Sequence, residues 1–560
     1  MVKYLAALSL VGVLILGGAL RLPGLWWSLP NPQHPMLTYH PDEGSMLAIL
    51  SHMNPATGDF NPNWFHYPHF HFYTLGAAMY GAKLTGKVTL ASDEAFYQTH
   101  PWETAKLYLV GRGVSLGYAM ATMVLLFLWA AWLGRPMWGV LAALGLALLP
   151  VHVIHSSFMT VDVALTFWCT LAMALLGIYV SQPKSNFVMG LAIFAVVGVA
   201  AAVKYTALLL LLPVWVGLYH KGDLSHIFSV LTSRRVWAGY GVLALVFMLL
   251  SPYVILDFKH SLPSITGLYS AVVVSEQESS SVPFAVLYHL LFSLPTGWGI
   301  PMMGMVVLSV IWALYRRQPM DWVCVVWVLG YILIFSYPQE KYLRYLLPVA
   351  PVTCLMAARL VYDLWVFSER RPFKAVVALG VTAVFVMTFF KSLAYALMLK
   401  KTDVRDMANA WIIENISQGS AVTLFALPYA YHPPVFYEFE DKGWGLYRPS
   451  TRYDLAVVPR IPSGRLKLTG DYFVLTEYDF HTAMAFGLNP KRQQLFVDRA
   501  FYNRLFSADN VQMVFSAKHR ARLGPFEFDS GYVPEDWLYI NPQQIVLKRV
   551  DVPVAPQGAT

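Results

Sequence analysis

Residues 107–154 read LYLVGRGVSLGYAMATMVLLFLWAAWLGRPMWGVLAALGLALLPVHVI, and almost every side chain in this stretch is apolar. Its Lys, Arg, Asp and Glu residues are limited to Arg112 and Arg135. A helix that crosses a membrane needs about 20 mostly apolar residues. The stretch therefore predicts two membrane-spanning helices, at 107–133 and 137–154, joined by a short basic turn.

The same composition recurs along the first 400 residues and predicts nine further spans. They lie at 4–20, 161–180, 187–202, 204–219, 236–256, 298–315, 320–337, 343–366 and 375–398. The first span has only Lys3 ahead of it and no convincing small-residue cleavage site, so we expect a retained anchor rather than a signal peptide. The fold class expected is a polytopic α-helical membrane protein with about 11 transmembrane helices.

The charge distribution separates a membrane part from a polar part. Charged residues make up 13% of the 560 residues, against about 25% in soluble domains. The net charge of +8 arises entirely within residues 1–400, whereas residues 401–560 are charge-balanced. This pattern excludes a soluble enzyme, a disordered chain and a basic nucleic-acid binder. We expect a transmembrane domain at 1–400 and a second domain at 401–560.

The short loops predict the orientation of the chain. With the N-terminus in the cytoplasm, every short cytoplasmic loop is basic, as the positive-inside rule requires. These loops contain Arg135, Lys184, Lys221, Arg234, Arg235, Arg316, Arg317, Arg370, Arg371 and Lys374. The long loops 21–106 and 257–297 and the C-terminal domain then lie on the extracytoplasmic side, where we expect the chemistry.

The C-terminal segment predicts a small α/β domain. A helix-like stretch at 403–416 is followed by short β-prone runs at 421–427, 455–458, 472–476 and 545–550. Strands that alternate with helical segments are typical of an α/β unit.

The first long loop carries two adjacent carboxylates, Asp42 and Glu43, directly after Pro41. One of them can accept a proton from an acceptor hydroxyl or amine, and both can orient a substrate or bind a cation. The alternative is a helix start, in which Asp42 is the N-cap and Glu43 interacts with the helix dipole. The two interpretations are compatible because a helix start holds a carboxylate firmly.

The same loop contains an aromatic and histidine-rich stretch at 64–73. Trp and Tyr are typical of a membrane interface. His66, His69 and His71 are candidate zinc ligands. Interfacial hydrogen bonding, or contact with a lipid phosphate, is the favoured alternative.

Four ionisable residues lie at span ends on the same side of the membrane as Asp42: Arg112, Asp162, Lys204 and Arg344. Charges at such positions usually face a cavity or a partner. Several cations and carboxylates at one depth predict a site for an anionic headgroup together with acid–base residues. The alternative for each cation is snorkelling at a helix end. For Asp162 we expect a cationic partner such as Arg112.

These residues stand in an order that resembles membrane glycosyltransferases of the GT-C type, in particular the protein O-mannosyltransferase and aminoarabinose-transferase superfamily. The matching positions are Arg21, Pro23, Asp42, Glu43, Gly111, Arg112, Ser115, His155, Ser156, Asp162, Phe167, Lys204, Tyr205, Thr206, Lys341, Arg344, Tyr345, Leu346, Leu347, Pro348, Pro351, Arg405, Ala408, Trp411, Ile412, Asn415, Gly419 and Ser420. No single motif among them is specific, and the order, spacing and shared membrane side carry the resemblance.

The resemblance implies an enzyme of a prokaryotic plasma (inner) membrane that uses a sugar linked through phosphate to a polyprenol. It implies transfer on the outer face with inversion, to a protein, lipid or polysaccharide acceptor, with Asp42 as the general base. Glu43 and Asp162 are further candidates for the catalytic site. Lys204 and Arg344 are the leading candidates for donor-phosphate binding, followed by Lys341 and Arg112. The candidates for substrate positioning are Tyr39, His40, His66, His69 and His155. No cofactor is expected to be required, and a divalent cation is left open.

Two other classes of function are compatible with the sequence. The first is a transporter or flippase of a lipid-linked anion, which fits the number of spans but not the long outer loop or the second domain. The second is a non-catalytic partner in envelope assembly that binds another protein through its C-terminal domain.

Overall fold

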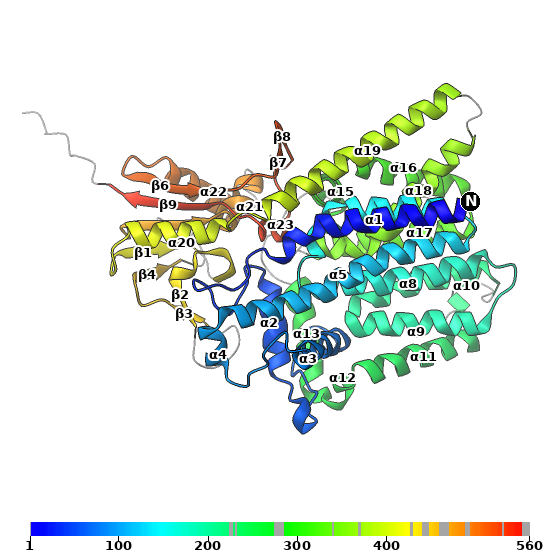
Figure 1. Cartoon of the computed structure of the whole chain (residues 1–560), viewed down its shortest axis with the longest axis horizontal. Helices are drawn as coiled ribbons and strands as arrows, with labels where there is room; N and C mark the ends of the chain where they lie inside the picture. Colours follow the sequence, from blue (N-terminus) through cyan, green and yellow to red (C-terminus); the bar gives the residue numbers. More distant parts are fainter. Residues whose placement is uncertain are drawn as a thin grey trace, which may run out of the picture.

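The structure is a computed structural model and describes residues 2–222, 228–229, 232–273, 285–338, 341–367, 371–425, 429–439, 447–458, 470–487, 493–528 and 531–550. Arg370 and the end of the predicted strand at 421–427 lie outside the described residues. Long helices lie side by side through one half of the molecule, and the main β-sheet lies beyond one end of them (Figure 1).

The helical half contains every apolar segment predicted to span the membrane. Its helices are α1 Val2–Leu25, α5 Pro101–Trp132, α6 Pro136–Leu148, α7 Pro150–His155, α8 Val161–Ser181, α9 Phe187–Val203, α10 Leu211–His220, α11 Arg234–Leu250, α16 Ile300–Arg316, α17 Pro319–Ser336, α18 Ala350–Phe367 and α19 Arg371–Met398. The predicted polytopic helical fold is confirmed.

The predicted number of eleven spans is not confirmed. Six described helices are long and apolar enough to cross a membrane, or seven if the bent pair formed by Val286–Trp298 and Ile300–Arg316 is one span. Several predicted spans are divided into shorter helices. For example, α6 ends at Leu148 and α7 begins at Pro150, because proline cannot donate the backbone hydrogen bond that would continue the helix.

Prolines mark many of the helix starts. Pro101, Pro136, Pro150 and Pro319 begin α5, α6, α7 and α17, and Pro41 begins α2 (Pro41–Ser51). Proline suits the first helical position because its fixed φ matches the helix and its missing N–H has no intrahelical partner there.

Two glycines allow neighbouring helices to approach closely. A Cβ atom added to Gly139 of α6 would lie 2.6 Å from the Cα atom of Phe127 in α5. One added to Gly198 of α9 would lie 2.7 Å from the carbonyl oxygen of Leu243 in α11. Small residues at such contacts are typical of helix packing in membranes.

The two long loops contain short helices. The first holds α2, the 3-10 helix η1 Pro55–Thr57, α3 Phe70–Leu84 and α4 Glu94–Thr99. α12 Tyr253–Leu256 lies at the end of the predicted span 236–256. The second loop holds α13 Phe258–Val273, α14 Ala285–Tyr288, the π-helical turn η4 His289–Ser293 and most of α15 Leu294–Trp298. The 3-10 helices η2 Tyr205–Leu210 and η5 Leu343–Val349 lead into α10 and α18.

The C-terminal region is built on a five-stranded mixed sheet with the order β4-β1-β5-β9-β6. The strands are β1 Ala421–Leu424, β4 Asp454–Val457, β5 Tyr472–Thr476, β6 Val511–Ala517 and β9 Gln544–Arg549. β1 pairs in parallel with β4 and β5, and β9 is antiparallel to β5 and β6. The four predicted strands fall on β1, β4, β5 and β9, whereas β6 was not predicted.

The remaining elements of this region complete an α/β unit. They are α20 Val404–Asn415, α21 Glu477–Phe486, α22 Gln493–Phe506, α23 Glu535–Leu538, the 3-10 turns η6 Tyr429–Tyr431 and η7 Pro434–Phe436, and the paired strands β2 Tyr437–Phe439 with β3 Tyr447–Pro449 and β7 Arg522–Leu523 with β8 Phe526–Glu527. The predicted helix at 403–416 corresponds to α20.

The two halves share their hydrophobic cores. Met36 and Leu37 of the first loop are buried with Ile412 of α20 in the core of the C-terminal region. Conversely, Trp537 and Leu538 of α23, in the C-terminal region, are buried in the core formed by the long helices. These two contacts fix the C-terminal region against the end of the helices at which the first loop lies.

Candidate active site

The acidic pair opens α2, as the helix-start interpretation predicts. His40 is the N-cap, and its Nδ1 accepts a hydrogen bond from the backbone N–H of Asp42 at 3.3 Å. Asp42 and Glu43 therefore lie in the first turn, where the helix dipole favours negative charge. The N-cap is His40 rather than Asp42, which leaves the Asp42 carboxylate available for other contacts.

Glu43 forms a fully buried ion pair with Arg112 of α5. Arg112 Nε lies 2.8 Å from Oε1 and Nη2 lies 2.6 Å from Oε2. Thr38 Oγ1 and the backbone N–H of Met159 donate to the same carboxylate at 2.6 and 2.7 Å. Burial alone would raise the pKa of Glu43, but the Arg112 guanidinium outweighs it and lowers the pKa below its usual value. Glu43 therefore holds the guanidinium of Arg112 in place.

Arg112 is committed to structural contacts. Besides Glu43, its Nη1 donates to the backbone carbonyls of Leu25 and Trp27, at 2.7 and 2.8 Å. Its side chain is 0% exposed. The geometry does not support the expected donor-phosphate role, because each nitrogen of the guanidinium already donates to a protein oxygen.

Four predicted residues meet beyond this pair, and each comes from a different element. Arg344 of η5 lies with Nη2 3.2 Å from Asp42 Oδ2 and with Nε 4.0 Å from Asp162 Oδ2. Lys204, which ends α9, lies with Nζ 2.8 Å from Asp162 Oδ1. Of the four span-end residues expected to converge with Asp42, Asp162, Lys204 and Arg344 do so, whereas Arg112 pairs with Glu43. Their chemical roles stay predictions.

The partner of Asp162 differs from the expected one. Asp162 lies in the first turn of α8 and pairs with Lys204 and Arg344, not with Arg112, because Arg112 is saturated by Glu43. The two carboxylates of the cluster also differ in access: the Asp42 side chain is 25% exposed and that of Asp162 is 4% exposed. Asp42 is thus the more accessible of the two carboxylates.

Aromatic rings surround the two cations. The Arg344 guanidinium lies 4.5 Å from the ring centroid of Tyr342 and 5.6 Å from that of Tyr539. Lys204 Nζ lies 5.0 Å from the ring centroid of Tyr345. Such contacts hold a cation while leaving its N–H groups able to donate to a further ligand.

Several buried polar atoms near the cluster lack a hydrogen-bond partner. They are Arg344 Nη1, His40 Nε2, both ring nitrogens of His155, and Thr160 Oγ1. Most buried polar groups in proteins are paired. The rings of His40 and His155 both contact the ring of Phe158, with centroids 4.6 and 6.1 Å from its centroid. Unpaired donors and acceptors of this kind are suited to a polar ligand.

Other predicted residues have their described contacts elsewhere. Tyr39 donates its hydroxyl hydrogen to Asp406 and lies under Arg405, so it joins the first loop to the C-terminal region. Lys341 Nζ donates to the carbonyl of Pro338 at 3.0 Å. The substrate-binding roles predicted for these two residues stay predictions.

The histidine-rich stretch contains a partly buried histidine, His66, and a fully buried one, His69. His66 lies against Trp64, with ring centroids 4.5 Å apart. His69 is fully buried beside Phe65. Within the part of the chain that the structure describes, no group of three or more His, Cys, Asp or Glu side chains is arranged to hold a metal ion, and this includes the proposed His66–His69–His71 set.

Sequence reasoning missed Asp536 and Tyr539, which reach the cluster from the C-terminal region. The Asp536 carboxylate accepts the backbone N–H groups of Leu343 and Arg344, both at 2.9 Å. Burial raises the pKa of Asp536 to about 6, although Arg344 and these two N–H groups act in the opposite direction. No local pattern marks an aspartate for a contact with a segment nearly 200 positions away.

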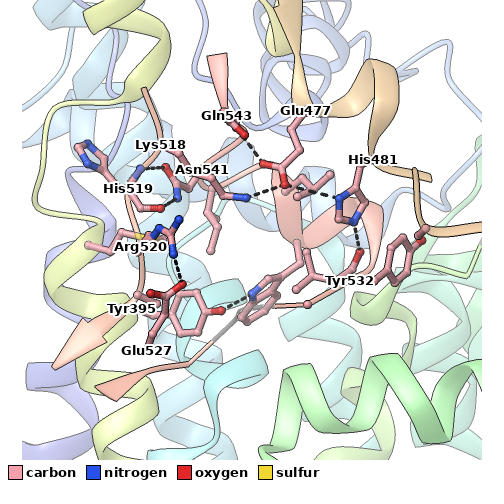
Figure 2. Close-up of a pocket in the computed structure, with 18 of the residues that line it drawn as sticks. Tyr395, Glu477, His481, Lys518, His519, Arg520, Glu527, Tyr532, Asn541 and Gln543 are labelled. Atoms are coloured by element: carbon pink, nitrogen blue, oxygen red, sulfur yellow. Dashed lines mark hydrogen bonds and ion pairs between the residues drawn. The ribbon is translucent and has the colours of Figure 1, made fainter. Parts of the chain in front are cut away.

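A separate cavity of about 470 Å³ lies between the end of α19 and the C-terminal region (Figure 2). Its charged groups are paired with one another. Glu477 accepts from Lys518 at 2.6 Å and from the backbone N–H of Gln543 at 2.9 Å, and Arg520 donates to Glu527 at 2.7 Å. None of the predicted site residues lines it.

Comparisons with known proteins identify the fold. ArnT from Cupriavidus metallidurans in the apo state is similar with a TM-score of 0.50 and 15% identity, over 98% of this chain and 99% of that chain. A structure of ArnT bound to undecaprenyl phosphate matches with a TM-score of 0.49 and 13% identity, over 100% of both chains.

The oligosaccharyltransferase of Archaeoglobus fulgidus in the apo form matches with a TM-score of 0.47 and 13% identity, over 74% of this chain. The present chain spans 58% of the length of that protein. No protein-family model and no curated protein matches the sequence. The chain has the fold of the GT-C membrane glycosyltransferases, with 98% of its length matched in the case of ArnT.

Proposed function

We propose that this chain transfers a sugar from a polyprenyl-phosphate donor to an acceptor at the extracytoplasmic face of the membrane, with inversion at the anomeric carbon and Asp42 as the general base. One observation carries the proposal. The partly exposed carboxylate of Asp42 lies 3.2 Å from the buried guanidinium of Arg344, which retains an unpartnered N–H group at Nη1.

The reaction is a direct displacement. The acceptor oxygen or nitrogen attacks the anomeric carbon, and Asp42 takes the proton that the nucleophile loses. The bond between the anomeric carbon and the phosphate oxygen breaks, and its electron pair leaves with the polyprenyl phosphate. A positioned base of this kind contributes typically 10²- to 10⁴-fold to the rate.

The leaving phosphate needs fixed positive charge rather than an acid. Arg344 Nη1 is the group best placed to donate to a phosphate oxygen, and Lys204 supplies a second charge from the other side of Asp162. Both side chains are nearly buried, so water weakens their electrostatic effect little. Asp162 keeps the two cations together while no phosphate occupies the site.

Glu43 and Arg112 provide the frame for this chemistry. Their buried pair joins the first turn of α2 to α5, and the backbone N–H of Met159 ties the same carboxylate to the segment that leads into α8. The pair therefore joins the helix turn that carries Asp42 to the segment that precedes Asp162. His40 and His155, with unpartnered ring nitrogens, are suited to bind sugar hydroxyls.

The donor class follows from the resemblance in sequence, and undecaprenyl phosphate, the lipid bound in one ArnT structure, is the leaving group that a donor of this class would release. The acceptor is a protein, lipid or polysaccharide exposed outside a prokaryotic plasma membrane. A divalent cation is not required by this mechanism, because Arg344 and Lys204 carry the charge that the phosphate needs.

The decisive experiment uses purified full-length protein in lipid nanodiscs and a radiolabelled polyprenyl-phosphate sugar. We expect release of the polyprenyl phosphate and transfer of label to an envelope extract. A flippase would move the donor between leaflets and leave the phosphate–sugar bond intact. A non-catalytic assembly partner would do neither. Asp42→Asn is the matched negative control, since it keeps the size of the side chain and removes the base.

A further inference from the structure

A segment of the C-terminal region, Pro534–Asn541, lies against the donor-phosphate site. Within it, Asp536 is 2% exposed, and its two carboxylate oxygens accept the backbone N–H groups of Leu343 and Arg344, one each, at 2.9 Å. These N–H groups open the 3-10 helix η5, and the first N–H groups of a helix have no partner within the helix. Asp536 thus supplies, from a distant part of the chain, the capping that η5 lacks locally.

The same segment also contacts the side chain of Arg344. The ring centroid of Tyr539 lies 5.6 Å from the guanidinium, and Tyr342 covers the guanidinium at 4.5 Å. Both the backbone and the side chain of Arg344 are therefore held by this short segment. The position of Nη1 relative to Asp42 depends on these contacts.

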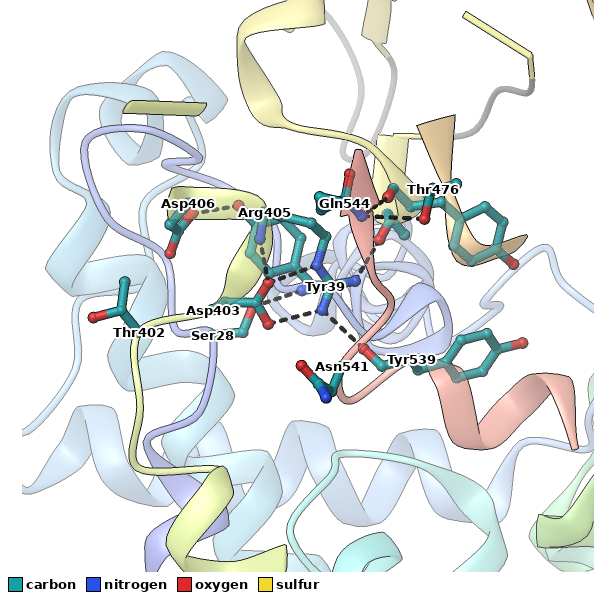
Figure 3. A network of polar contacts seen from close by, with 12 residues as sticks. Ser28, Tyr39, Thr402, Asp403, Arg405, Asp406, Thr476, Tyr539, Asn541 and Gln544 are labelled. Carbon is teal, nitrogen blue, oxygen red and sulfur yellow. Dashed lines mark hydrogen bonds and ion pairs between the residues drawn. The ribbon is translucent and has the colours of Figure 1, made fainter. Parts of the chain in front are cut away.

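Two anchors fix the segment itself. On one side, Trp537 Nε1 donates to the hydroxyl of Tyr395 in α19 at 2.8 Å. On the other, the carbonyl of Tyr539 accepts from Arg405 Nη2 at 2.8 Å. Arg405 is fully buried, is paired with Asp403 and lies over the ring of Tyr39 (Figure 3). The segment is thus held by hydrogen bonds to α19 on one side and to α20 on the other.

We infer that Asp536 is a positioning residue of the transferase: through its hydrogen bonds to the backbone of η5, the C-terminal region sets Arg344 in the geometry that binds the donor phosphate. The inference rests on the proposed function. It assigns to the C-terminal region a part in donor binding, and it predicts that the membrane-spanning part alone has an incomplete donor site.

The neighbouring residue Glu535 provides a matched control. Its Oε1 accepts from Thr482 Oγ1 at 2.6 Å, so its described contact lies within the C-terminal region. Glu535→Gln changes the charge of α23 by the same amount as Asp536→Asn but leaves η5 untouched. A difference between the two variants therefore reports on the contact with η5 rather than on charge.

The test measures donor KM, acceptor KM, kcat and the affinity for polyprenyl phosphate, all with full-length protein in nanodiscs. We expect Asp536→Ala to raise the donor KM about tenfold or more, the scale of hydrogen bonds to a charged group, and to leave the acceptor KM within about twofold. Asp536→Asn should give an intermediate loss, because its amide oxygen still accepts one N–H. Glu535→Gln should behave as the wild type.

A double-mutant cycle shows whether Asp536 acts through Arg344. In an Arg344→Ala background, Asp536→Asn should weaken polyprenyl-phosphate binding by less than about twofold, since the group that it positions is gone. Full additivity of the two losses would overturn the inference. If Asp536→Ala does not fold, as judged by thermal melting, the test of the positioning role rests on Asp536→Asn.

The binding measurement separates this inference from the proposed function. If the wild type binds polyprenyl phosphate but transfers no sugar, the proposed function fails, and the effect of Asp536→Asn on binding still tests the positioning role. If the wild type transfers sugar and Asp536→Asn has the donor KM and lipid affinity of the wild type, the positioning role is wrong and the proposed function stands.

Discussion

Arg344 and Asp42 form an ion pair, with 3.2 Å between Nη2 and Oδ2. The proposed phosphate ligand and the proposed base are therefore in direct contact. In a displacement with inversion, the nucleophile and the leaving phosphate lie on opposite faces of one sugar carbon, so we expect the bound donor to separate Asp42 from Arg344. A phosphate that binds Arg344 also competes with Asp42 for the guanidinium, which links donor binding to the environment of the base.

Asp42→Asn should reduce kcat by about 10²- to 10⁴-fold, because the amide cannot accept the proton of the nucleophile. The melting temperature should stay close to that of the wild type, since the side chain is partly exposed and the substitution keeps its size. Asp59→Asn, at an exposed carboxylate in the same loop, serves as the control for a change of charge. Full transfer activity in the Asp42 variant would remove this residue from the role of base.

Arg344→Ala should weaken the binding of polyprenyl phosphate by roughly 10- to 100-fold, the range expected for lost hydrogen bonds to a charged ligand. The same variant should bind the corresponding polyprenol, which lacks the phosphate, as the wild type does. Comparing the two lipids in one fluorescence competition assay isolates the contribution of the phosphate. Equal losses for both lipids would place Arg344 against the lipid chain rather than the phosphate.

The meeting of Asp162, Lys204 and Arg344 was predictable from the sequence, but the direction in which each residue faces around the helix bundle was not. Arg112, Asp162, Lys204 and Arg344 were all expected at one level because each stands at the end of an apolar run, and depth follows from counting along such a run. Which carboxylate faces which cation depends on how the helices rotate and pack. Arg112 was therefore expected to pair with Asp162, whereas in the structure it forms an ion pair with Glu43.

The contact between Asp536 and η5 could not have been predicted either, for a similar reason. The sequence around it predicts only a short helix start after Pro534. Its partner N–H groups belong to η5, and their need for a distant acceptor becomes visible only when the backbone geometry of that helix is known. Strand β6 was missed because apolar and polar residues do not alternate regularly in its sequence, VQMVFSA.

Glu43→Ala should destabilise the protein by about 3–5 kcal/mol, because it leaves the buried guanidinium of Arg112 without its partner. Thermal or denaturant unfolding of the detergent-solubilised protein measures this effect. Arg112→Lys tests the alternative role of Arg112 in donor binding. We expect the lysine variant to be less stable and, where folded, to bind polyprenyl phosphate with unchanged affinity. A stable lysine variant that has lost this affinity would restore Arg112 as a phosphate ligand.

Glu477→Gln should change the dependence of stability on pH. Burial alone would raise the pKa of Glu477, but its hydrogen bond with His481 and the charge of Lys518 outweigh burial and lower the pKa to about 2. A carboxyl group whose pKa is lower in the folded state stabilises the protein above its unfolded pKa of about 4.5, and this contribution is lost as the pH falls towards 2. A shift of this size corresponds to roughly 3 kcal/mol at neutral pH.

The measurement is thermal melting of the full-length wild type and Glu477→Gln between pH 7 and pH 2.5. The variant should melt at a lower temperature at pH 7. The two curves should approach each other as the pH falls from about 4.5 towards 2, because the unfolded state takes up a proton that the folded carboxylate, paired with Lys518, takes up only near pH 2. Glu414→Gln, at an exposed position of α20, controls for the loss of one surface charge. A difference in melting temperature that stays constant down to pH 2.5 would show that Glu477 acts by packing and not by its charge.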